Sequence, residues 1–153
     1  MSRQRAEEVM RRYLTEVVGE GKLELIDELA AEDMVDHTQT IPGRAGLVAH
    51  VKSFRERNRD VELNVERIIA SDDEVVGIWT WRATHSTDMY GVPPLGAKLE
   101  VRVASIFRLR DGMVIEYEVI SDALTGFRRM GADVEIRPAS ATRLSRRALG
   151  RGA

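Results

Sequence analysis

The stretch that decides the fold is VRVASIFRLRDGMVIEYEVISD, residues Val101 to Asp122. Two runs rich in β-forming residues are joined by Asp111-Gly112, and Asp-Gly between alternating apolar runs is a strong signal for a β-hairpin. Side chains alternate along a strand, so one face of the second run carries Glu116, Glu118, Ile120 and Asp122. Such a face is either solvated or lines a cavity. We expect it to line a cavity.

Upstream of this hairpin, the periodicity of the apolar residues changes at Asp60. Before Asp60, helical spacing predicts three helices, and after it a two-residue spacing predicts strands. The predicted helices run from Ser2 to Val17, from Leu23 to Ala30 and from about Leu47 to Asn58. The predicted strands begin at Val61, Glu74, Leu99 and Met113. We also expect an extended segment at 33–38 and a short helix at 123–130.

Helices followed by about four mostly antiparallel strands make this an α+β chain. A strongly curved sheet wrapped on three amphipathic helices gives a cone with an interior cavity. The 153 residues are enough for one domain with a sizeable core, which we place at residues 1–132. Cysteine is absent, and no run approaches the roughly 20 apolar residues of a membrane span. We therefore expect a soluble, cytoplasmic protein without a membrane role.

Charge is distributed unevenly along the chain. Residues 136–153 hold five arginines and no acid, and the remaining 18 basic and 25 acidic residues give the rest of the chain a net charge of −7. An acidic body argues against a nucleic-acid partner. The segment 133–153 has little apolar content, so we expect a basic, mobile tail. We find no cofactor motif and no His/Cys cluster for a metal, and we expect neither a cofactor nor a metal.

Several short segments follow one another in a specific order. They are Tyr13-Leu14-x-x-Val17, Val35-Asp36-His37, Pro42-Gly43-Arg44-x-Gly46-Leu47, Thr84-His85-Ser86, Gly91-Val92-Pro93-Pro94-x-Gly96 and Phe107-Arg108-x-x-Asp111-Gly112. With the acidic last strand, they make the chain resemble the SnoaL-like polyketide cyclases of the NTF2-like fold over nearly its whole length. The resemblance implies a cone of three N-terminal helices packed on a curved, mostly antiparallel sheet that encloses a pocket.

The resemblance also implies a kind of chemistry. Similar proteins close a ring in an aromatic polyketide by an intramolecular aldol reaction or act as cofactor-independent hydroxylases on related polycycles, and many relatives have no known activity. The last strand of the family often reads Glu-His-Trp-Asp, whereas here it reads Glu116-Tyr117-Glu118-Val119. The acid expected at position 119 is therefore absent, and Asp122 becomes the nearest candidate.

An aldol closure needs a base that removes a proton beside a carbonyl, and donors that hold the developing enolate. A carboxylate in an apolar pocket suits the base, because desolvation raises its pKa toward the working pH. The predicted catalytic residues are Asp122, His85 and His37. The predicted substrate-binding residues are Tyr13, Trp79, Trp81, Met89, Arg102 and Glu118.

The acidic candidates also have structural interpretations. Asp122 precedes the short helix at 123–130, and its alternative interpretation is the N-cap of that helix. Glu116 is better explained as a cross-strand ion-pair partner of Arg102 or Arg108. Glu118 is as easily a surface residue as a pocket residue.

The histidine and aromatic candidates have structural interpretations as well. His37 could be a structural hydrogen-bonding residue, and His85 a loop anchor. His50 lies on the apolar stripe of a predicted helix, which suggests a position at the edge of the core. Trp79 and Trp81 share one face, so they form either a pocket wall or a patch at a dimer interface.

Three functional hypotheses follow from these residues. The first is a polyketide cyclase with carboxylate acid/base catalysis, the second a cofactor-independent hydroxylase of an anthracycline-like polyketide, and the third a non-catalytic domain that binds a small ligand. In the first two the partner is an aromatic polyketide-like substrate. Apolar residues on both faces of the strands at 74–85 and 99–109 predict a homodimer, with a tetramer as the alternative.

Overall fold

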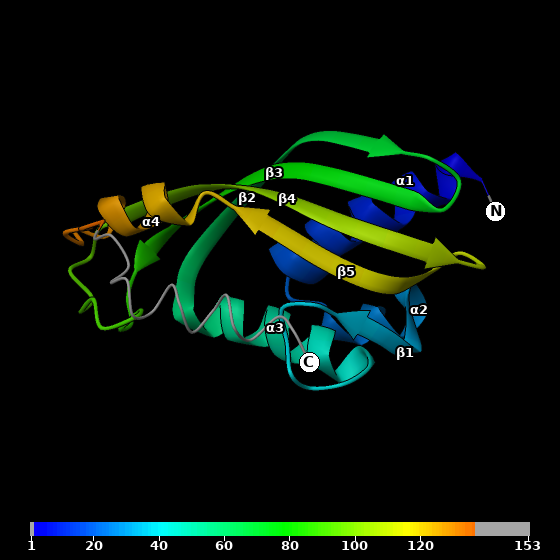
Figure 1. The fold of residues 1–153 in the computed structure, drawn as a ribbon, viewed down its shortest axis with the longest axis horizontal. Helices are drawn as coiled ribbons and strands as arrows, with labels where there is room; N and C mark the ends of the chain where they lie inside the picture. The colour runs from blue at the N-terminus through cyan, green and yellow to red at the C-terminus, as the bar shows by residue number, and fades with distance from the viewer. Residues whose placement is uncertain (1, 137–153) are drawn as a thin grey trace, which may run out of the picture.

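A five-stranded sheet in the order β1-β5-β4-β3-β2 is the frame of the structure (Figure 1). The computed structural model describes residues 2–136, so most of the expected tail at 133–153 lies outside the described residues. The strands are β1 (Ala30–Asp36), β2 (Asn58–Ala70), β3 (Glu74–His85), β4 (Lys98–Arg110) and β5 (Met113–Ser121). The helices are α1 (Arg3–Arg12), the π-helix η1 (Tyr13–Gly19), the 3-10 helix η2 (Leu23–Leu25), α2 (Ile26–Leu29), α3 (Arg44–Arg57) and α4 (Ala123–Arg129).

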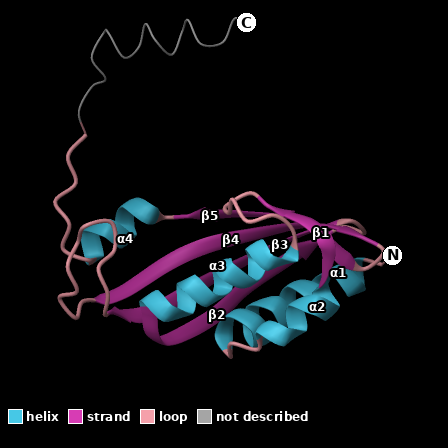
Figure 2. Ribbon diagram, turned by 90° about the horizontal axis from the view of Figure 1, so that it is seen from below, coloured by secondary structure: helices cyan, strands magenta, loops and turns pink. Residues whose placement is uncertain are grey.

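The β4–β5 hairpin forms as the sequence predicts. Arg110 pairs with Met113 across a two-residue turn, in which Asp111 has φ 53° and Gly112 has φ 81°. Two successive positive φ values match a type I′ turn, whose twist suits antiparallel strands. The hairpin belongs to a curved sheet that helices cover on one face (Figure 2), which confirms the α+β class and agrees with the expected NTF2-like cone.

The sheet starts earlier in the chain than the periodicity change at Asp60 indicates. Residues 33–36 of the extended segment expected at 33–38 belong to β1, which pairs in parallel with β5 and makes a fifth strand, whereas 37–38 form a turn. Parallel partners are joined by long crossovers, so no turn signal in the sequence reveals this pairing.

Helices α1, η1 and α3 cover the concave face of the sheet (Figure 2). Ala6, Val9 and Met10 of α1 are fully buried. The helix approaches β3 most closely at Gly77, where an added Cβ would lie 2.7 Å from the sulfur of Met10. A side chain at position 77 would therefore push α1 away from the sheet. None of the described helices is long and apolar enough to cross a membrane.

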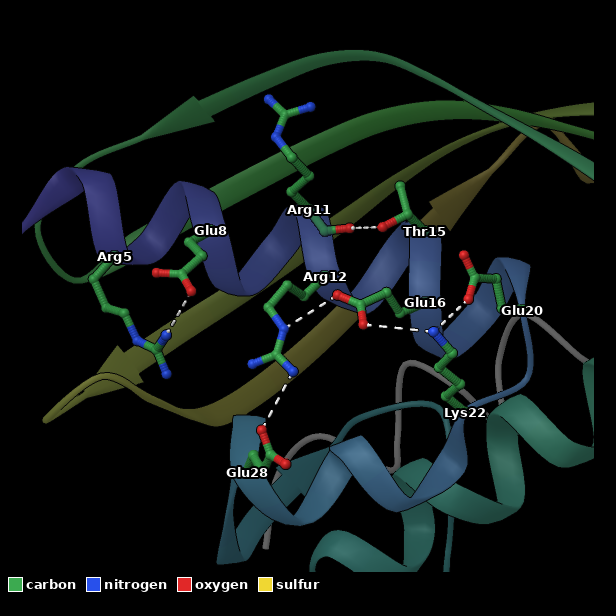
Figure 3. A network of polar contacts seen from close by, with 9 residues as sticks. All are labelled: Arg5, Glu8, Arg11, Arg12, Thr15, Glu16, Glu20, Lys22 and Glu28. Atoms are coloured by element: carbon green, nitrogen blue, oxygen red, sulfur yellow. Dashed lines mark hydrogen bonds and ion pairs between the residues drawn. The ribbon is translucent and has the colours of Figure 1, made fainter.

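The sequence spacing predicted one regular helix at the N-terminus. The structure instead passes from α-helix into the π-helix η1 at Tyr13. The wider turn brings Tyr13 and Val18, five residues apart, to the same cavity wall. Arg12 at the junction binds Glu16 at 3.2 Å and Glu28 of α2 at 3.3 Å (Figure 3). These ion pairs connect the irregular helix to α2.

Candidate functional site

A cavity of about 180 Å³, which we call the inner chamber, lies between the concave face of the sheet and helices η1 and α3. Its aromatic lining residues are Tyr13, Phe54, Trp79, Trp81 and Tyr117. Phe54 stands edge-on to both indoles, with ring centroids 6.3 Å from Trp79 and 5.2 Å from Trp81. The two tryptophans therefore form a pocket wall and not a patch on the outer face of the sheet.

A second cavity of about 170 Å³, the outer chamber, adjoins the first. The two chambers share Trp81, Val101 and Ser121 as lining residues. The loop at 86–97 and helix α4 meet beside the outer chamber at the end of the sheet away from the N-terminus (Figure 1). They contribute Met89, Tyr90, Phe127 and Met130. Together the chambers form an elongated, mainly apolar site of the kind that binds small molecules.

His50 and Asp36 form a hydrogen-bonded pair at the wall of the inner chamber. His50 Nδ1 lies 3.0 Å from Asp36 Oδ2, and Thr38 donates its backbone N–H and hydroxyl to Oδ1 at 2.8 and 2.6 Å. Burial alone would raise the pKa of Asp36, but the hydrogen bonds from His50 and Thr38 outweigh it and hold the pKa below its ordinary value. Asp36, only 3% exposed, is thus an ionised acceptor that orients the His50 ring.

The pair fixes which His50 nitrogen is free to accept a proton. Because the Asp36 carboxylate accepts from Nδ1, the neutral ring carries its proton on Nδ1 and leaves Nε2 as an acceptor. No hydrogen bond joins Nε2 to another group within residues 2–136. His50 lines the inner chamber, so the pair has the arrangement of a base with an orienting carboxylate.

Two tyrosines provide hydroxyl groups at the same chamber. Tyr13 and Tyr117 pack edge-on with ring centroids 5.9 Å apart, and Tyr117 also packs on His50 at 5.4 Å. Burial raises the pKa of Tyr117 to about 12 and that of Tyr13 well above its usual value. Both hydroxyls therefore stay protonated near neutral pH and can donate hydrogen bonds.

The structure places five of the predicted residues on the concave side or beside it. Tyr13, Trp79 and Trp81 line the inner chamber, and Met89 lines the outer chamber. His85 is fully buried near the end of β3, although it belongs to neither chamber's lining residues.

The other four predicted residues lie elsewhere, and the expectation that the acidic face of β5 lines the cavity is wrong. Asp122 is an exposed N-cap of α4 whose Oδ1 accepts from Thr125 N at 3.1 Å. Hydrogen bonds from Thr125 lower the Asp122 pKa, the opposite of the shift expected for a base in an apolar pocket. Arg102 pairs with Glu66 at 2.8 Å, and Glu118 is exposed. His37 is also exposed and lies 3.4 Å from Glu116.

A β-bulge in β5 is the physical reason for this error. Leu109 pairs with Val114, whereas the preceding Arg108 pairs with Glu116, so Ile115 is an extra residue. Val114 and Tyr117 both point inward as a result, and beyond the bulge the inner face continues with Val119 and Ser121. Glu116 faces outward and pairs with Arg108 at 2.8 Å, as its structural interpretation predicted.

Asp122 offers a direct test of the difference between a cap and a catalytic base. We expect Asp122→Asn and Asp122→Ala to keep substrate turnover, because the side chain lies outside both chambers. The alanine variant should lower the melting temperature by a few degrees, since it removes the cap of α4. Calorimetry and an activity assay on both variants check this. A large loss of turnover without a loss of stability would return Asp122 to the catalytic site.

Sequence reasoning missed His50, Asp36 and Tyr117. Asp36 and His50 are fourteen residues apart on a strand and a helix, and no known spacing motif connects them. Tyr117 is flanked by Glu116 and Glu118, so the strand looked acidic and not aromatic. The one available signal was the resemblance segment Val35-Asp36-His37, from which we selected His37 instead of its buried neighbour. Position 119, where the resemblance led us to expect an acid, does line the inner chamber, but as valine.

Comparisons with known proteins agree with this fold. The model of the family described as SnoaL-like polyketide cyclase matches residues 8–130. No curated protein matches the chain.

Solved structures resemble the fold closely. TsrD from Streptomyces laurentii has a TM-score of 0.79 at 20% identity, over 87% of this chain and 99% of its own. AclR from Streptomyces galilaeus, titled "a putative hydroxylase", has a TM-score of 0.72 at 21% identity, over 85% of this chain and 98% of its own. IdmH from Streptomyces antibioticus, titled "a putative polyketide cyclase", has a TM-score of 0.70 at 29% identity, over 82% of this chain and 97% of its own. Because the family model spans most of the chain, this protein belongs to the SnoaL-like polyketide cyclase family.

Proposed function

We propose that this protein is an enzyme that closes a ring in an aromatic polyketide intermediate by an intramolecular aldol reaction, with His50 as the general base. The observation that supports this proposal is the His50–Asp36 pair at the wall of an apolar chamber. The base assigned from sequence to Asp122 is replaced by a histidine.

The proposed reaction moves one proton and forms one carbon–carbon bond. His50 Nε2 takes a proton from the carbon beside a substrate carbonyl, and Asp36 stabilises the imidazolium that results. Tyr13 and Tyr117 donate hydrogen bonds to the enolate oxygen. The enolate carbon attacks a second carbonyl of the same molecule, and the imidazolium returns its proton to the alkoxide. No other reactant is consumed.

The shape of the site supports a polycyclic substrate. The inner chamber of about 180 Å³ is smaller than common ligand pockets of roughly 300–1,000 Å³. A ligand with several fused rings would therefore extend past Trp81 into the outer chamber. Its rings would lie against Phe54, Trp79 and Trp81, while the reacting side chain reaches His50.

The test uses an anthraquinone that carries a β-keto ester side chain, with product mass, chromatographic mobility and oxygen uptake recorded together. We expect a cyclised product that is an isomer of the substrate, or that isomer after loss of water, and no oxygen consumption. Binding of the compound without any conversion would contradict the proposal and favour the non-catalytic ligand-binding domain.

Hydroxylation is the second candidate function, and one observation favours it. The chamber wall carries Val119 at the position where the family resemblance led us to expect an acid, and a substrate carbanion made by His50 could react with oxygen. In that case the assay would show oxygen uptake and a product of increased mass. The base would be the same, so the two functions differ in the fate of the carbanion.

We also propose a homodimer that forms through the outer face of the sheet. Apolar residues gather on this face, among them Ile78, Ala104, Ile106 and Ile120, and Ala104 pairs directly with both Ile78 and Ile120. Ile120 is 65% exposed, which leaves an apolar patch uncovered in the single chain.

We expect sedimentation at micromolar concentration to give a dimer, and Ile120→Glu to give a monomer, because the substitution places two charges near the centre of a symmetric interface. Ile41→Glu, at an apolar residue that is 46% exposed in the loop between β1 and α3, is the matched control. A monomeric wild-type protein would contradict the assembly.

A further inference from the structure

Buried polar atoms without a partner are concentrated at one place in the described chain. Within residues 2–136, four buried side-chain nitrogen or oxygen atoms lack a hydrogen bond: Asn58 Oδ1, His85 Nδ1, His85 Nε2 and Ser86 Oγ. Other buried polar side chains, such as Asp36 and Ser105, are bonded. A buried polar atom without a partner is costly, so a cluster of four indicates a missing hydrogen-bonding group.

The three residues are neighbours at the end of the concave face. Asn58 and His85 pair across β2 and β3, and Ser86 follows His85. Both paired residues are almost inaccessible, with exposures of 4% for Asn58 and 0% for His85. Leu99 lines the outer chamber and pairs with Ala83, two residues before His85. The cluster therefore lies beyond Leu99 along the same pair of strands, past the lining residues of the outer chamber.

Helix α3 sets the distance from this cluster to His50. His50 and Asn58 are eight residues apart, which corresponds to about 12 Å along the helix axis. Phe54 lies between them, one turn from each, and its ring lines the inner chamber. Asn58 Nδ2 donates to Phe54 O at 2.8 Å, which holds the side chain at the helix end and leaves Oδ1 free.

The atom types of the cluster select the chemistry of the missing group. Asn58 Oδ1 and one nitrogen of a neutral His85 are acceptors, so the ligand must bring a hydrogen. The other His85 nitrogen and the Ser86 hydroxyl are donors, so the ligand must also bring a lone pair. A carboxylate lacks the hydrogen and an ammonium lacks the lone pair. A hydroxyl group has both.

We propose that His85, Asn58 and Ser86 form a subsite for a hydroxyl group at the end of the substrate that is remote from His50. The assignment rests on the proposed function for its aromatic ligand, and it names the substrate class as a hydroxylated polycycle about 12 Å long between its reacting and recognised ends. His85, which the sequence suggested as catalytic, acts here in recognition.

The test compares 2-hydroxyanthraquinone with anthraquinone. Both tryptophans of the chain line the inner chamber, so quenching of tryptophan fluorescence measures binding of either compound. We expect the wild type to prefer the hydroxylated compound by at least about tenfold, because the compound without the hydroxyl leaves the cluster unpaired. His85→Leu should remove the preference, since it deletes two of the four atoms and keeps a similar volume.

Two further variants make the result decisive. His37→Leu is the matched control, because His37 is exposed on the other side of the sheet, and it should keep the preference. Ser86→Ala deletes a single atom that has no partner, so it should fold even if His85→Leu does not, and it should reduce the preference several-fold. Equal binding of both compounds by the wild type, or an undiminished preference in Ser86→Ala, would overturn the subsite.

The subsite and the proposed reaction can fail separately. His50→Gln should keep the preference for the hydroxylated compound, because the substitution lies about 12 Å from the cluster. A lost preference in His85→Leu with no ring closure by the wild type would support the subsite and reject the aldol reaction. Ring closure by a wild type that binds both compounds equally would do the reverse.

Discussion

Replacement of His50 by glutamine is expected to lower turnover by about 10²–10⁴-fold, the loss typical of removing a positioned acid/base. Glutamine has a similar volume, and its amide can still donate a hydrogen bond to Asp36, but no atom of it takes up a proton near neutral pH. Substrate binding should change little, because the aromatic wall formed by Phe54, Trp79 and Trp81 remains. Steady-state kinetics combined with tryptophan quenching separates the two effects.

The matched control is His37→Gln, which makes the same replacement at an exposed histidine outside the chambers. It should leave turnover unchanged. Asp36→Asn should resemble His50→Gln in rate, since an asparagine amide can donate to Nδ1 and favour the tautomer in which Nε2 carries the proton. Wild-type turnover in His50→Gln would remove His50 from the mechanism and require a base elsewhere in the chambers.

Phe107→Ala should have the largest effect on stability and lower the free energy of unfolding by about 3–5 kcal/mol. Phe107 is fully buried, and its ring centroid lies 4.9 Å from that of Tyr13 and 5.2 Å from that of Tyr117. The loss is a large part of the roughly 5–15 kcal/mol typical of a domain. Turnover should fall as well, because both enolate donors pack on this ring.

Urea unfolding measures the change, with Leu95→Ala as the control, since Leu95 is 69% exposed in the loop beside α4. The control should lie within about 0.5 kcal/mol of the wild type. Equal, small losses in both variants would mean that the core closes around the missing ring, in which case the two tyrosines are not held by Phe107.

The local signals in the sequence predicted most of the fold. Asp111-Gly112 predicted the hairpin because the turn needs positive φ at both residues, and the change of periodicity at Asp60 separated helices from antiparallel strands. The parallel pairing of β1 with β5 could not be predicted from local signals, because it depends on contact between segments about 80 residues apart. The sequence also did not reveal the π-helical turn at Tyr13, because its apolar residues fit an α-helical pattern.

The candidate site was predicted less well than the fold. The aromatic wall was found, because Trp79 and Trp81 share a face with the inward residues of β3. The catalytic assignment placed Glu118, Ile120 and Asp122 on the inward face of β5, whereas the extra residue at Ile115 leaves Val119 and Ser121 facing inward instead. A bulge leaves no certain mark in a sequence. The His50–Asp36 pair depends on how α3 packs beside β1, which is a tertiary property.

The π-helix η1 makes the shape of the binding site depend on backbone length as well as on side-chain identity. If the same residues were wound as an ordinary α-helix, the five steps from Tyr13 would place Val18 about 140° around the axis and away from the chamber wall. The same amino acids would then enclose a differently shaped space. Point substitutions that change specificity in one relative would therefore have the same effect only in relatives whose helix has the same length. Insertions and deletions in this helix are a separate route by which new substrates could evolve.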